Sequence, residues 1–164
     1  MVSAPVSIPV GLLEMMSRGV SVIVGSRDAS LRPSLMRAVG SQLSQDRRTI
    51  TVYLSRGQSR QLLQDISATR QVAAVFSEPS THRTVQVKAG NARVRPAAAE
   101  DAPVLARYLA SMEQEIQRVG YAPPMTRAML AHRLEDVVAV SFEPQQAFDQ
   151  TPGPRAGARL GSGT

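Results

Sequence analysis

The sequence contains no cysteine, which excludes disulfide bonds, thiolate catalysis and cysteine-based zinc sites. Its two histidines, His82 and His132, are too few for a histidine-rich site, so no metal is expected. Aromatic residues make up 4% of the chain and tryptophan is absent, which leaves few surfaces for stacking nucleic-acid bases. No apolar run reaches the length of about 18 residues that a membrane-spanning helix needs, and the N-terminal segment does not resemble a signal peptide. We therefore expect a cytoplasmic protein that binds neither membrane nor nucleic acid.

Lysine is nearly absent as well, because Lys88 is the only lysine among 19 basic residues. The other 18 are arginines, and the net charge is +6. A composition rich in arginine and alanine is typical of proteins from GC-rich bacterial genomes. The arginines are spread along the chain instead of forming a basic tail, which argues against a nucleic-acid binder. Each arginine nevertheless offers a rigid fork of donors for phosphate or carboxylate groups.

Several catalytic motifs are missing. The sequence has no Gly-x-x-x-x-Gly-Lys-Ser/Thr phosphate loop, no dinucleotide-binding glycine fingerprint, no His-Glu-x-x-His and no Gly-x-Ser-x-Gly elbow. No pair of carboxylates suggests acid–base catalysis, and no catalytic residue can be named. If the protein is an enzyme, an organic cofactor is expected to carry the reaction.

A strand-to-helix turn in the segment Val52–Leu63 is the most informative feature that is present. Arg56 and Arg60 lie at the expected N-terminus of the helix, where unpaired N–H groups and the helix dipole already create positive potential. The first turn of the helix contains no carboxylate to balance them. A bound phosphate would balance this charge, held by helix N–H groups, arginine forks and the hydroxyls of Ser55 and Ser59. The alternative is that Ser59 is an ordinary N-cap and the arginines are solvated.

Hydrophobic patterning predicts one domain over residues 1–164, with more strand than helix. Short spacings between successive strands indicate antiparallel pairing, and the order of elements favours a small barrel with helices at its ends. Residues 150–164 are rich in proline and glycine, and we expect an extended C-terminal arm without regular structure. Strands are predicted at 20–27, 34–39, 49–54, 71–76, 83–94 (bent at 89–90) and 137–142, and helices at 9–18, 59–66, 103–119 and 126–134.

An ordered set of short motifs runs through residues 18–96. In chain order these are Leu31-Arg32-Pro33, Met36-Arg37-Ala38-Val39, Val52-Tyr53-Leu54-Ser55, Ser59-Arg60, Val72–Phe76 and His82–Val87. Together they resemble the FMN-binding split barrel of pyridoxamine 5'-phosphate oxidase-like proteins, over about half of the chain. The resemblance implies a mainly β fold of the α+β class: an antiparallel split β-barrel flanked by helices. It also implies a homodimer that holds two FMN cofactors at the subunit interface.

The resemblance places Ser55, Ser59 and Arg60 at the positions that hold the FMN phosphate, and Arg56 adjoins them. This agrees with the charge argument made from the turn itself. The implied activity is an FMN-dependent oxidoreductase in which the flavin carries the hydride.

Three further cofactor-binding positions follow from the resemblance. Arg37 matches the arginine of the second strand that approaches the cofactor, and Thr84 falls where the family often has a glutamine facing the flavin. The 150–164 arm is predicted to lie over the cofactor or the partner subunit, with Arg155 pointing at the flavin or the substrate. Arg37 could instead point to solvent, and Thr84 could be an ordinary strand residue.

The sequence also departs from true pyridoxamine phosphate oxidases. Gln61 replaces their usual lysine after the Ser-Arg pair, and the residues that grip pyridoxal phosphate are missing. Pyridoxamine phosphate is therefore not expected as the substrate, which stays unknown. The alternative function is a non-catalytic flavin- or haem-binding protein on the same barrel, in which His82 or His132 would be the axial haem ligand.

Overall fold

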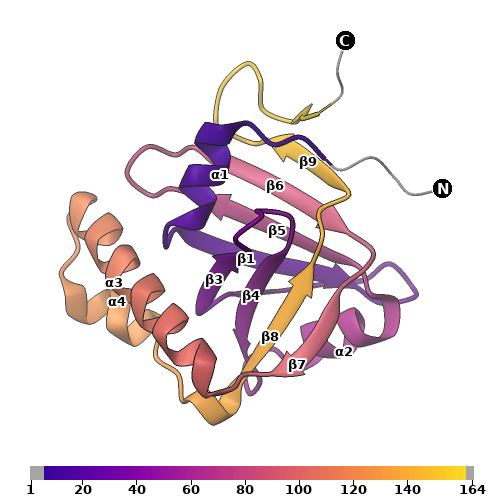
Figure 1. Cartoon of the computed structure of the whole chain (residues 1–164), viewed down its shortest axis with the longest axis horizontal. Coiled ribbons are helices and arrows are strands. Elements are labelled where there is room, and N and C mark those ends of the chain that lie inside the picture. Colours follow the sequence, from indigo (N-terminus) through magenta and orange to yellow (C-terminus); the bar gives the residue numbers. More distant parts are fainter. Residues whose placement is uncertain (1–5, 162–164) are drawn as a thin grey trace.

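The computed structural model describes residues 6–161, whose strands form two antiparallel sheets (Figure 1). The larger sheet has six strands in the order β10-β9-β6-β5-β1-β2. The predicted antiparallel pairing is therefore confirmed, since every neighbouring pair in this sheet runs in opposite directions. The bounds of these strands are β1 Ser21–Arg27, β2 Pro33–Arg37, β5 Val72–Ser77, β6 Thr84–Ala89, β9 Gln146–Asp149 and β10 Ala158–Arg159.

The smaller sheet has four strands in the order β3-β4-β8-β7. Its central pair, β4 and β8, joins segments from opposite halves of the sequence along six residue pairs. Their burial is nearly continuous, which explains their runs of Val, Ile, Leu and Phe. The bounds are β3 Gly40–Leu43, β4 Ile50–Ser55, β7 Arg93–Pro96 and β8 Val137–Phe142.

Four α-helices and two short 3₁₀ helices complete the described chain. In α2, Leu62 and Ile66 are buried one turn apart, so the helix packs one apolar face on the core. In α3, Leu105, Tyr108 and Met112 do the same. The bounds are α1 Val10–Ser17, α2 Arg60–Thr69, α3 Ala102–Arg118, α4 Pro123–Met129, η1 Ala99–Asp101 and η2 Leu134–Asp136. None of these helices is long and apolar enough to cross a membrane.

The chain passes between the two sheets at short connections, and this splits elements that the sequence pattern treats as continuous. The predicted strand over 34–39 ends as β2 at Arg37, and β3 starts in the other sheet at Gly40. The predicted long strand over 83–94 is wrong for the same reason, because β6 and β7 belong to different sheets. Gly90 lies at that crossing, where an added Cβ would come within 2.8 Å of the Gln71 amide.

Two other expectations are corrected. The predicted helix over 126–134 is instead α4, which starts at Pro123, a position where the missing N–H of proline costs no helical bond. Residues 150–164 were expected to lack regular structure, yet Ala158–Arg159 pair with Phe148 and Asp149 as β10. Residues 162–164 of that arm lie outside the described part of the chain.

Candidate functional site

The turn between β4 and α2 leaves several hydrogen-bond donors without a partner. The N-cap residue of α2 is Ser59, but its side chain makes no capping hydrogen bond. Ser59 is 2% exposed, and its Oγ atom has no partner among residues 6–161. The amides of Arg60, Gln61 and Leu62 likewise find no backbone acceptor in that range. The geometry therefore does not match an ordinary serine N-cap, and an acceptor placed at this turn would satisfy an otherwise costly buried hydroxyl.

Arg56 and Arg60 add two positive charges to the same turn, and neither forms a direct ion pair within residues 6–161. Neither guanidinium is within 4.0 Å of a carboxylate or hydrogen-bonded to any described residue. Both line a groove of about 720 Å³ between α2 and β7, which we call the α2–β7 groove. Leu63 forms part of its helix wall, and Val94 and Pro96 form part of its strand wall. The groove thus joins a cationic end to largely apolar walls, a combination that suits an anion with an apolar body.

The strand wall of the groove is held by a buried carboxylate. Arg95 lines the groove and donates two hydrogen bonds to Asp101, at 2.7 and 2.9 Å. The Tyr53 hydroxyl donates to the same carboxylate at 2.8 Å. The hydrogen bonds from Arg95 hold the pKa of Asp101 well below its usual range, although burial opposes this. Burial and the neighbouring carboxylate raise the pKa of Tyr53. Sequence reasoning missed this network: Arg95 and Asp101 are only six residues apart but match no known motif, and Tyr53 reaches Asp101 from 48 positions away.

Asp136 supplies a carboxylate that the sequence did not reveal at this turn. Its Oδ2 atom accepts a hydrogen bond from Ser55 Oγ at 2.9 Å and a long one from the Gly57 amide at 3.5 Å. Its backbone carbonyl accepts the Arg56 amide at 2.7 Å. The Ser55 hydroxyl is therefore engaged within the protein, whereas the Ser59 hydroxyl is not. Only a three-dimensional contact places Asp136 here, since it precedes β8 in the sequence.

The remaining predicted positions lie elsewhere. Arg37 ends β2 and donates to Ser21 Oγ at 2.7 Å, with no hydrogen bond to the β4–α2 turn. Thr84 begins β6, where its hydroxyl contacts Ser77 Oγ at 2.7 Å. Arg155 is exposed in the C-terminal arm and pairs with Asp149 at 3.2 Å. Figure 1 shows that this arm and α2 lie at well-separated parts of the molecule. Within a single chain, Ser55, Arg56, Ser59 and Arg60 therefore lie together at the β4–α2 turn. The other three predicted positions lie outside that group.

Arg37 and Thr84 nevertheless share one face of the six-stranded sheet. Arg37 lies opposite Ile23, and Thr84 lies opposite Ser77, which in turn faces Ser21. Ser21 and Ile23 are two residues apart in β1, so their side chains point the same way. The alternate residues Val22 and Val24 point into the core and are fully buried. We call the opposite side, with Arg37 and Thr84, the outer face of the six-stranded sheet.

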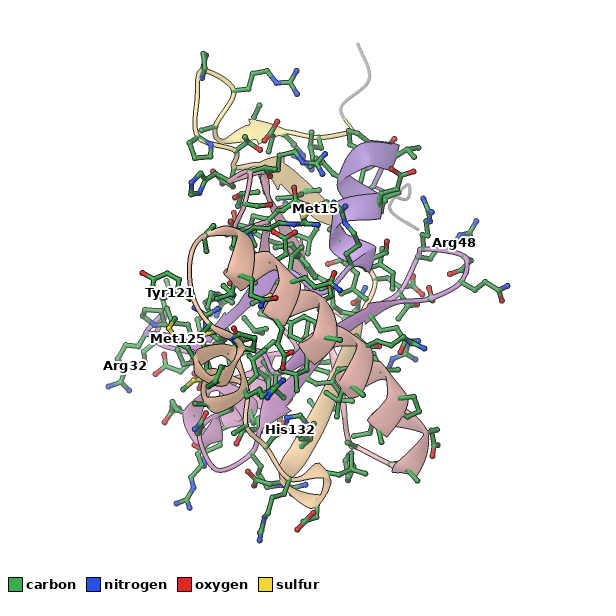
Figure 2. All side chains as sticks on the ribbon, turned by 90° about the vertical axis from the view of Figure 1, so that its left-hand side faces the viewer. Met15, Arg32, Arg48, Tyr121, Met125 and His132 are labelled. Atoms are coloured by element: carbon green, nitrogen blue, oxygen red, sulfur yellow. The ribbon has the colours of Figure 1, made fainter. Side chains whose placement is uncertain are left out.

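The two histidines occupy different surroundings, and neither lines the α2–β7 groove. His82 is exposed at the β5–β6 turn with a φ of 62°. His132 is half-buried after α4 (Figure 2), and its Nδ1 atom lies 2.9 Å from the Leu130 carbonyl. If Nδ1 carries the proton, the Nε2 atom of His132 is the free imidazole nitrogen.

Neither a protein-family model nor a curated protein matches the sequence. Solved structures do match. An F420 reductase matches with a TM-score of 0.59 and 15% identity, covering 85% of this chain and 98% of that one. A pyridoxamine 5'-phosphate oxidase-related, FMN-binding protein from Nostoc punctiforme matches with a TM-score of 0.52 and 9% identity, covering 91% and 88%. HutZ, the haem storage protein from Vibrio cholerae, matches with a TM-score of 0.50 and 16% identity, covering 85% and 92%.

These matches span most of every chain compared, at identities that show the fold alone. They confirm the expectation of an α+β split barrel built from antiparallel strands. The chain has the split-barrel fold of pyridoxamine 5'-phosphate oxidase-like proteins.

Proposed function

We propose that this protein binds FMN through its phosphate at the β4–α2 turn and acts as an FMN-dependent oxidoreductase. The observation that carries the proposal is the partnerless, buried Ser59 hydroxyl beside two arginines that form no ion pair within residues 6–161. Helix N–H groups, a hydroxyl and guanidinium forks are the donor types that bind phosphate in proteins. The donor set therefore fits the phosphate of FMN.

In this proposal each side chain has a separate task. Arg60 and Arg56 supply charge, and Ser59 supplies a hydroxyl donor once its side chain turns toward the ligand. Asp136 fixes the turn through Ser55 and the Arg56 backbone. The apolar walls of the α2–β7 groove exclude water from the body of the ligand. FMN, when bound, supplies hydride transfer, so the protein needs no nucleophile or metal of its own.

The proposal includes a homodimer formed through the outer face of the six-stranded sheet. Ile23, Val75 and Phe148 lie in one cross-strand row on this face and keep part of their surface exposed. Leu35 on the neighbouring strand is 66% exposed. A second copy would cover these apolar side chains and place another chain beside Arg37 and Thr84. Val75→Arg is expected to convert a dimer into a monomer in analytical ultracentrifugation, and a wild-type monomer would contradict this part of the proposal.

Non-catalytic haem binding is the second candidate, because the haem storage protein HutZ has the same fold. His132 would then be the ligand through Nε2, since its Nδ1 atom is hydrogen-bonded to the backbone. Absorption of the purified protein separates the candidates. The two visible bands of a flavin support the first proposal and a Soret band supports haem, whereas a colourless protein that takes up neither added cofactor contradicts both.

The phosphate assignment is tested with FMN and riboflavin, which differ only in the phosphate group. Ser59→Ala combined with Arg60→Ala is expected to weaken FMN binding by at least about 1–3 kcal/mol, because charge-assisted hydrogen bonds are lost. Riboflavin binding should barely change. Arg159→Ala, which alters an exposed arginine on β10, is the matched control. Equal losses for both ligands would place the phosphate elsewhere.

A further inference from the structure

A second pocket lies where α3 crosses β3, away from the β4–α2 turn. It has a volume of about 360 Å³ and shares no lining residue with the α2–β7 groove. We call it the α3 pocket, and Figure 2 looks toward α3, which supplies one of its walls. Its other walls come from the end of α1 with the residues that follow, and from β3. A ligand in the α3 pocket would therefore contact none of the residues that line the proposed FMN groove.

The walls of the α3 pocket are fixed by hydrogen bonds between distant segments. The Tyr108 hydroxyl donates to the Val20 carbonyl at 2.6 Å, and the Ser111 hydroxyl donates to the Gly19 carbonyl at 3.0 Å. Gly19 packs so closely on α3 that an added Cβ would lie 2.5 Å from the Tyr108 carbonyl oxygen. These contacts fix α3 to the two residues before β1, so the pocket is preformed, as ligand sites usually are.

Three polar side chains line the α3 pocket without a partner in residues 6–161. The Ser41 hydroxyl is buried and makes no hydrogen bond. The Gln42 amide group and the Arg107 guanidinium also make none within that range, and Arg107 has no carboxylate within 4.0 Å. All three can donate a hydrogen bond to an oxyanion in the pocket, Gln42 and Arg107 directly and Ser41 after its hydroxyl rotates.

The charged side chains that line the α3 pocket are both arginines. Its lining includes Arg18 and Arg107, and no aspartate or glutamate. Arg18 is held in place by an ion pair with the buried Glu78 at 2.5 Å. Although burial works to raise it, the pKa of Glu78 is lowered by hydrogen bonds and by the charges of Arg18 and Arg83. This ion pair orients the Arg18 side chain, while Arg107 keeps its charge uncompensated.

From these observations we infer that the α3 pocket is a second ligand site, which binds a small organic anion with a carboxylate or phosphate group. Arg107 and Gln42 hold the oxyanion, and Ser41 joins them once its hydroxyl, which is closed off from solvent, rotates toward the pocket. Leu43 and Val104, which also line the pocket, contact a short apolar body. The volume of the pocket is half that of the α2–β7 groove, which favours a ligand smaller than FMN.

The test uses inorganic phosphate and acetate as probes on the full chain carrying Ser59→Ala and Arg60→Ala, so that the β4–α2 turn does not contribute. In two-dimensional ¹H–¹⁵N spectra, at least one probe is expected to shift the amides of 41–43 and 107–111 in a saturable way. Arg107→Gln should weaken this binding at least fivefold. Arg159→Gln, an exposed arginine on β10, should leave it unchanged.

Ser41→Ala separates a binding role from a structural one. Removing a partnerless buried hydroxyl should leave the melting temperature equal or higher, yet lower the affinity for the probe at least threefold. The inference is overturned if neither probe moves these amides, or if Arg107→Gln binds as well as Arg159→Gln. A Ser41→Ala variant with unchanged affinity would remove Ser41 from the site and contradict the stated donor set.

Discussion

The two walls of the α2–β7 groove use arginine in opposite ways. On the strand wall, Arg95 is locked to the buried Asp101 by two hydrogen bonds. At the start of the helix wall and in the turn before it, Arg60 and Arg56 contact no carboxylate among residues 6–161. Removing the partner of a buried carboxylate such as Asp101 is destabilising, whereas an unpaired arginine at a helix N-terminus raises the local positive potential. Ion pairing thus distinguishes Arg95, which has a structural role, from Arg56 and Arg60, which are available to a ligand, although all three line the same groove.

Breaking the locked pair should produce the largest effect. Asp101→Asn removes the charge that holds Arg95 and disturbs the hydrogen bond from Tyr53, so it should lower the free energy of unfolding by about 2–3 kcal/mol. Urea denaturation of the ligand-free protein measures this. A loss no greater than that of Arg60→Gln would mean that the two walls do not differ.

Low pH should remove the stabilising contribution of Asp101. Because hydrogen bonds from Arg95 outweigh burial, the pKa of Asp101 is lower in the folded protein than in the unfolded chain. The ionised Asp101 carboxylate therefore contributes its full share to the free energy of unfolding above the pKa of the unfolded chain, about 3.9. This share is lost as pH falls through the pKa of Asp101 in the folded protein. The gap in unfolding free energy between wild type and Asp101→Asn should stay constant from about pH 5 to 8 and narrow below about pH 4. A gap that narrows near neutral pH would point to another group.

At the β4–α2 turn, removing the charge of Asp136 should strengthen ligand binding instead of weakening it. Its carboxylate accepts the Ser55 hydroxyl, and it repels any phosphate bound at the turn. Asp136→Asn keeps an acceptor but removes the charge, so FMN should bind more tightly by about 1 kcal/mol, roughly fivefold. Calorimetric titration with FMN, with riboflavin as the control, checks this. Weaker FMN binding would mean that the carboxylate mainly supports the turn.

Ser59→Ala should affect folding and binding in opposite directions. Loss of a partnerless buried hydroxyl should raise the unfolding free energy of the ligand-free protein by up to about 1 kcal/mol. The same change should weaken FMN binding. A variant that loses stability would show that Ser59 Oγ has a structural partner, most simply an ordered water.

The smallest effect is expected from the free arginine itself. Arg60→Gln should change the unfolding free energy by less than about 0.5 kcal/mol, since an exposed side chain without contacts contributes little. FMN affinity should nevertheless fall. Thermal melting with and without FMN measures both quantities, and equal losses in the two conditions would contradict a role for Arg60 in binding.

Local patterns predicted much of this molecule. The alternation in β1 and β5 and the apolar stripe of α3 identified those elements, because burial on one face fixes the spacing of apolar residues. The charge argument at the β4–α2 turn was also local, since Arg56, Ser59 and Arg60 are close in sequence. The structure adds that Ser59 has no capping bond, which the sequence left open.

What the sequence did not show depends on contacts between distant segments. Asp136 reaches Ser55 across 81 positions, and no local pattern marks it as part of the turn. The crossings after β2 and β6 were read as continuous strands, because alternation does not reveal a change of sheet. Arg155 was expected to point at a cofactor, but in one chain it pairs with Asp149; its assignment to a site stays a prediction.

The pairing of β4 with β8 also governs when the turn can form during synthesis. β4 ends at Ser55, but its partner strand begins at Val137, directly after Asp136. Closing so long a loop is slow, because its chain entropy is lost before the contacts form. The edge of β4 that pairs with β8 therefore stays uncovered until residues 137–142 have been synthesised. The β4–α2 turn acquires its final geometry late in folding, so a chain truncated before residue 136 would lack a formed anion site, even though every residue of the turn is present.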